Sequence, residues 1–138
     1  MTPFAALCGL AGLSQREAAE FHEVRLDTIK SWASGRRDAS EGAIEQLREL
    51  IAIQERIADK FLDTLETRTE QMGPPQDIEL GYPTDDHEAQ SLGWPCVGAW
   101  RAMAARIIAE ADVPVRLVPR GSTIATAAAA DENERKSR

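Results

Sequence analysis

Charged and polar side chains alternate with apolar ones between residues 24 and 37. Val24, Ile29 and Trp32 recur on one helical face and should point inward. The side chains left at the N-terminal end or on the outer face are Arg25, Leu26, Asp27, Thr28, Lys30 and Ser31. An arginine can hold a guanine bidentately, an aspartate can accept from a cytosine amino group, and a leucine can touch a thymine methyl. A helix here would have the chemistry to contact base edges in a major groove.

A second group of polar side chains suits phosphate contacts, which position a protein on DNA without reading its sequence. This group consists of Gln15, Lys30, Arg36 and Arg37. Simpler interpretations remain open. Arg25 or Lys30 taken alone is most often a solvated surface charge, and Asp27 favours a helix N-terminus through the dipole. Arg36 and Arg37 could equally stabilise the C-terminal end of the same helix.

Catalytic and metal-binding patterns are not apparent in the chain. It contains no Ser/His/Asp constellation, no phosphate-cradling glycine loop and no metal-ligand cluster, so we expect neither an enzyme nor a cofactor. Cys8 and Cys96 are far apart and predict neither a disulfide nor a zinc site. We expect His22 and His87 on the surface. The aromatic residues Tyr82, Trp94 and Trp100 could line a pocket, although core packing is the favoured interpretation.

The net charge of −7 seems unfavourable for binding nucleic acid, but it is unevenly distributed over the 138 residues. The first 40 residues carry five basic and five acidic side chains, so the acidic excess lies further along the chain. An acidic body repels DNA wherever the basic side chains are not docked, which favours one binding pose. We find no apolar run long enough to cross a membrane and no signal peptide, and we expect a cytoplasmic protein.

Three short helices are predicted before residue 36. Thr2 and Pro3 can start the first, in which Phe4, Leu7, Cys8 and Ala11 recur at helical spacing. Ser14 to Glu17 forms a capping box that starts a second helix, running to about residue 22. The third starts at residues 24 to 25 and ends at Gly35.

One long helix, or two nearly continuous ones, is predicted from about residue 40 to residue 71. Its apolar residues keep an approximate three-to-four spacing: Ile44, Leu47, Ile51, Ile57, Phe61 and Leu65. About 30 helical residues span about 45 Å, more than a 40-residue head can cover. We expect a second copy of the chain to cover the rest, with a hairpin inside the monomer as the alternative.

A small α+β unit is predicted after Gly73, Pro74 and Pro75. Alternating apolar residues predict strands over 77–82 and 113–118. Thr84 can cap a short helix ending at Ser91, and Pro95 can open a longer one. Two strands are marginal alone, so this sheet should pair with a second protomer or lie against the long helix. Residues 122–138 are predicted to be disordered.

The segment from Leu13 to Arg37 resembles the helix-turn-helix of the Cro/repressor (XRE-type) family. Gln15, Ala19, Ile29, Trp32 and Gly35 carry the resemblance over about a quarter of the chain. Glu23 stands where the family has its turn glycine, so the tight left-handed turn is either absent or slightly strained. The resemblance implies a sequence-specific DNA-binding regulator in which Arg25, Leu26, Asp27, Thr28 and Ser31 read bases.

The whole layout more loosely resembles small phage and mobile-element autorepressors, including anti-CRISPR-associated regulators. The residues that carry this likeness are Leu92 to Pro95 and Trp100. It implies a homodimeric repressor on a palindromic double-stranded operator. The alternative is an antitoxin-like interaction subunit that binds a partner through residues 73–121 and DNA only secondarily. No small-molecule effector is indicated.

The expected fold class is therefore mainly α, with a helix-turn-helix domain, a long connecting helix and a small α+β dimerisation unit. We place the DNA-binding domain at residues 1–54, the long helix with the α+β unit at 55–121, and the tail at 122–138.

Overall fold

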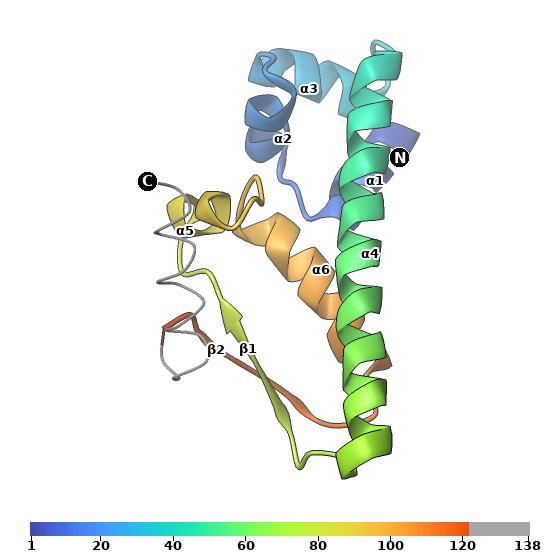
Figure 1. The fold of residues 1–138 in the computed structure, drawn as a ribbon. Helices are drawn as coiled ribbons and strands as arrows, with labels where there is room; N and C mark the ends of the chain where they lie inside the picture. The colour runs from blue at the N-terminus through green and yellow to red at the C-terminus, as the bar shows by residue number, and fades with distance from the viewer. Residues whose placement is uncertain (122–138) are drawn as a thin grey trace.

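Six helices and two strands make up residues 1–121, the part of the chain that the computed structural model describes. Figure 1 shows α4 running the length of the molecule, with the three short N-terminal helices packed around its first half. The elements in chain order are α1 (Pro3–Ala11), α2 (Gln15–His22), α3 (Leu26–Ser34), α4 (Glu41–Met72), β1 (Ile78–Tyr82), α5 (Asp86–Ser91), α6 (Val97–Glu110) and β2 (Val115–Pro119). The expected mainly α fold with a small α+β unit is confirmed.

The caps predicted for the first helices are present. The Thr2 hydroxyl accepts a hydrogen bond from the Ala5 amide, and it also donates to the Ala33 carbonyl at 3.0 Å. This second bond ties the start of α1 to the end of α3. Ser14 and Glu17 form the reciprocal capping box at the start of α2.

The long helix is continuous over its 32 residues, and Ser40 caps it through the Ala43 amide. Much of its apolar stripe is covered within the chain, because α1 and α6 both pack against it. Leu47 and Ile51 are buried, whereas Ile57 is 40% exposed. We expected a second copy of the chain to cover this stripe. Over much of its length, α6 of the same chain covers it instead.

The sheet consists of β1 and β2, which run parallel with Ile78 opposite Val115 and Leu80 opposite Leu117. A parallel pair needs a crossover connection, and α5 and α6 provide it. Both strands lie within two residues of their predicted bounds. The two helix starts are corrections: Asp85, not Thr84, caps α5, and α6 starts at Val97 after Cys96 rather than at Pro95. Asp85 is the N-cap because its carboxylate accepts a hydrogen bond from the Glu88 amide at 2.8 Å.

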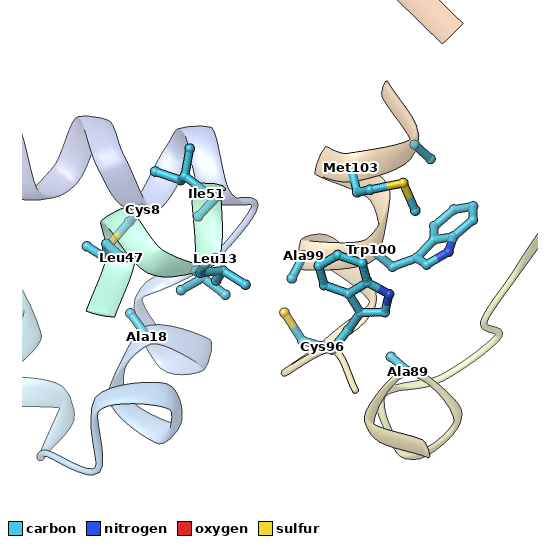
Figure 2. Packing of buried hydrophobic residues seen from close by; sticks show 14 of the residues in the cluster. Cys8, Leu13, Ala18, Leu47, Ile51, Ala89, Cys96, Ala99, Trp100 and Met103 are labelled. Carbon is cyan, nitrogen blue, oxygen red and sulfur yellow. The ribbon is translucent and has the colours of Figure 1, made fainter. Parts of the chain in front are cut away.

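One hydrophobic core joins the N-terminal helices to the α+β unit. Figure 2 shows Cys8, Leu13 and Leu47 in one part of this core and Trp100 and Met103 in another. Gln54 lies fully buried between the two parts, and its amide donates to the carbonyls of Ala11 and Ala99 at 2.9 and 3.0 Å. The predicted boundary at residue 54 falls inside α4, and residues on both sides of it belong to this core. The predicted tail, 122–138, lies outside the described residues.

Candidate nucleic-acid interface

The segment from α2 to α3 folds as two helices joined by a tight turn. Ala18 and Ala19 are buried in α2, and Ile29 of α3 is fully buried against the core. Glu23 ends α2 in the left-handed conformation, with φ 56° and ψ 44°. The turn therefore keeps its left-handed form with a glutamate in place of glycine, and the amide of Val24 donates to the Ala19 carbonyl to close it.

Helix α3 lies at one end of the molecule, beside the start of α4 (Figure 1). Arg25 is the N-cap residue of α3, one position before its first helical residue, and its side chain is exposed. Asp27 and Lys30 are also exposed, and Leu26 and Thr28 are half-buried. These five side chains lie within a single short helix and its cap, as the sequence predicted.

Ser31 is not brought to this exposed face. Its side chain is buried, at 5% exposure, and its hydroxyl accepts a hydrogen bond from Nη2 of Arg36 at 2.8 Å. The neighbouring Arg37 amide donates to the Ser31 carbonyl. In this conformation Ser31 holds the segment after Gly35 against α3, and its hydroxyl is not offered to a base.

The residues expected to contact phosphate lie at the start of α2, on α3 and just after α3. Gln15 is exposed at the first position of α2, while Arg36 and Arg37 are exposed just after α3. Lys30 lies on α3 between them in sequence. The exposed candidates for phosphate contact therefore come from α2, from α3 and from the segment that follows α3.

His22 is a correction to the sequence analysis, because it is buried rather than on the surface. Its ring contacts Phe4, Phe21 and Trp32, with centroids 4.9 to 6.3 Å away. Nδ1 lies 2.8 Å from Oε1 of Gln46 on α4, a hydrogen bond that fixes α2 against the long helix. The helical spacing of Ala18, Ala19 and His22 carries this signal in the sequence. His87 is exposed, as expected.

The remaining aromatic and sulfur-containing candidates belong to the core. Trp94 and Trp100 are each 7% exposed, and Tyr82 is half-buried, which supports the packing interpretation over a pocket. Cys8 and Cys96 are free and buried, and burial raises the pKa of both thiols to about 11. Both thiols are therefore protonated at neutral pH.

Comparisons with protein-family models and with curated proteins found no match to this chain. Within residues 1–121, no helix is both long enough and apolar enough to cross a membrane.

Proposed function

We propose that the protein is a sequence-specific DNA-binding transcriptional regulator that acts in the cytoplasm as a homodimeric repressor on a palindromic operator. The observation that carries the proposal is the position of α3, which buries Ile29 beneath it and exposes Arg25, Asp27 and Lys30 at the end of the molecule. Helix α3 has nine residues, about 14 Å of length, and an α-helix with its side chains is about 10–12 Å in diameter, which fits a major groove about 12 Å wide.

The proposal gives the residues of α3 and the segments next to it in sequence two roles. Arg25, Leu26, Asp27 and Thr28 face base edges, with the Arg25 guanidinium on a guanine and the Asp27 carboxylate on a cytosine amino group. Gln15, Lys30, Arg36 and Arg37 contact phosphates. Ser31 acts indirectly, because its hydrogen bond to Arg36 orients that guanidinium beside α3.

The charge distribution supports a single docked orientation. Acidic side chains exceed basic ones over the rest of the chain, whereas the first 40 residues are balanced. Repulsion between DNA and the acidic body disfavours nonspecific adhesion through other faces. Two heads in a homodimer would bind two half-sites, so the preferred operator should be palindromic.

The test begins by selecting binding sites for the full chain from a pool of randomised duplexes. Arg25→Ala should then weaken binding to the selected site by about 1–3 kcal/mol and relax the preference at one base pair per half-site. Arg37→Ala should weaken binding to selected and scrambled duplexes alike, and lower the salt slope by about one unit per lost phosphate contact.

Arg56→Ala provides the matched control, because Arg56 is an exposed arginine on α4 outside the α2–α3 segment. This control should bind both duplexes as the unaltered protein does. If Arg25→Ala weakens binding to both duplexes equally, or changes binding to neither, α3 is not the helix that reads the base sequence. Failure to select any sequence would reject the function itself.

A further inference from the structure

The two-stranded sheet leaves one edge of β2 without a strand partner among the described residues. The Ile78 amide donates to the Pro114 carbonyl, and the Arg120 amide donates to the Tyr82 carbonyl. In a parallel pair, alternate residues direct both backbone groups toward the neighbouring strand. The even-numbered residues of β2 therefore bond to β1, and Val115 and Leu117 turn their N–H and C=O groups outward.

The side chains of β2 are also incompletely covered. Leu117 lies opposite Leu80 in the parallel register, and it is 44% exposed. In the adjacent row, Ile78 of β1 is buried at 8%. Helix α6 packs on β1 and not to a comparable extent on β2, so the apolar face of the sheet continues past the cover that α6 provides.

We propose that this edge binds the same edge of a second copy of the chain, with the two β2 strands antiparallel and Leu117 opposite the partner's Leu117. The two leucines exchange a pair of backbone hydrogen bonds in this register, and each Val115 amide donates to the partner's Pro119 carbonyl. Because proline has no N–H, about four hydrogen bonds join the strands. The product is one four-stranded sheet in the order β1-β2-β2-β1.

This register matches the side chains on both faces of the sheet. On the apolar face, Leu80 and Leu117 continue into Leu117 and Leu80 of the partner subunit, so four leucines form one row. On the opposite face, Arg116 lies across from the partner's Val118. Arg116 is already paired with Asp77, at 3.0 Å, and with Glu79, so its charge is compensated within its own protomer.

A two-fold axis between Leu117 and the partner's Leu117 relates the two edges. The contact is therefore self-complementary, and the assembly stops at two copies. A second copy supplies an identical edge, which matches this one in register. Its Arg116 is likewise already paired with carboxylates of its own protomer, so it adds no unpaired charge to the contact. Four strands also exceed the two that are marginal as an isolated sheet. The inference rests on the homodimer of the proposed function and names the surface that builds it.

Sedimentation equilibrium of the full chain without DNA tests the proposed edge. Leu117→Glu places two carboxylates opposite each other at the axis and should raise the dimer dissociation constant by about 100-fold or more. Ile108→Glu is the matched control, because Ile108 is 43% exposed and belongs to α6, which packs mainly on α4 and β1 rather than on β2. This control should leave the constant unchanged, and circular dichroism should show the same helix content in both variants.

A cross-link then tests the register. Opposed residues in a hydrogen-bonded antiparallel pair have Cα atoms about 5.5 Å apart, so Leu117→Cys should give a covalent dimer with a short thiol-reactive cross-linker. Ile108→Cys should not, and the native cysteines are buried. A monomeric unaltered protein, a Leu117→Glu protein that remains dimeric, or equal disruption by Ile108→Glu would each overturn the edge assignment. A monomeric Leu117→Glu protein that still binds a half-site weakly leaves the proposed DNA binding intact.

Discussion

Glu23 lies in the turn between α2 and α3. Among residues 1–121, it is the only residue other than glycine that has a positive φ. A side chain in the left-handed conformation costs about 1–2 kcal/mol because Cβ approaches the following carbonyl. Burial of Ala18, Ala19 and Ile29 on either side holds the turn closed in spite of this cost. The strain is therefore stored where the two helices of the candidate interface are set at their mutual angle.

Replacing Glu23 with glycine should release that strain. We expect Glu23→Gly to raise the free energy of unfolding by about 0.5–1 kcal/mol, since part of the gain is offset by the greater freedom of glycine in the unfolded chain. Urea denaturation measures the change. Glu23→Ala removes the same carboxylate but keeps a Cβ, so it should give no such gain. Equal stabilisation by both substitutions would mean that charge, rather than backbone strain, is the cause.

Single-residue placement in α3 could be predicted in part from the sequence. The spacing of Ile29 and Trp32 indicated which face is buried, and it correctly left Arg25, Asp27 and Lys30 exposed. Ser31 lies at the border of that face, where a hydrogen bond from Arg36 decides its burial. His22 was misplaced because its partners Phe4 and Gln46 come from two other helices, and polarity alone suggested the surface.

Two glycines allow a close contact between α1 and α6. A Cβ built on Gly12 would lie 2.1 Å from the Gly98 carbonyl oxygen. A Cβ built on Gly98 would lie 2.1 Å from the Gly12 carbonyl oxygen. Gly12 also has φ 80° at the end of α1. The end of α1 and the first turn of α6 can therefore meet only because neither residue has a side chain.

Gly12→Ala should destabilise the protein by more than about 2 kcal/mol, because it adds a steric clash to an unfavourable backbone conformation. Thermal unfolding followed by circular dichroism measures the loss. Gly42→Ala is the control, since Gly42 lies in α4 with open space around its Cβ position. There, alanine should stabilise by up to about 1 kcal/mol through its helix propensity. A Gly12→Ala protein as stable as the control would mean that the α1–α6 contact readjusts freely.

The elements themselves were largely predictable because their start and stop signals are local. Two helices begin after the serines that the sequence indicated, Ser14 and Ser40. Two helices end at the glycines that it indicated, Gly35 and Gly73. The pairing of elements was not local. Nothing in the strand patterns distinguishes a parallel from an antiparallel pair. The contact of α6 with α4 includes the hydrogen bond from Gln54 to the Ala99 carbonyl, two residues that are 45 positions apart in the chain.

At the scale of the whole molecule, the helix-turn-helix segment and the α+β unit share one core. Gln54 bonds to both α1 and α6, and Arg106 of α6 pairs with Glu55 of α4 at 2.9 Å. A movement of the sheet would therefore be transmitted to α1 through packed helices. If the proposed β2 edge fixes two copies against each other, the same contacts fix the separation of the two α3 helices.

This shared core should make residues 1–121 unfold as one cooperative unit. The tryptophans are suited to test this, because Trp32 lies in α3 and Trp94 and Trp100 lie in the α+β unit. In Trp32→Phe, fluorescence reports on the α+β unit alone, and in Trp94→Phe/Trp100→Phe it reports on α3. Within each variant, at fixed protein concentration, the fluorescence midpoint in urea should coincide with that of helical circular dichroism. Coincidence is expected because separating the two parts would expose Gln54 and the apolar residues around it at the same step. If α3 unfolds at a lower urea concentration than the α+β unit, the division at residue 54 describes two independently folding domains and the shared core contributes little to their coupling.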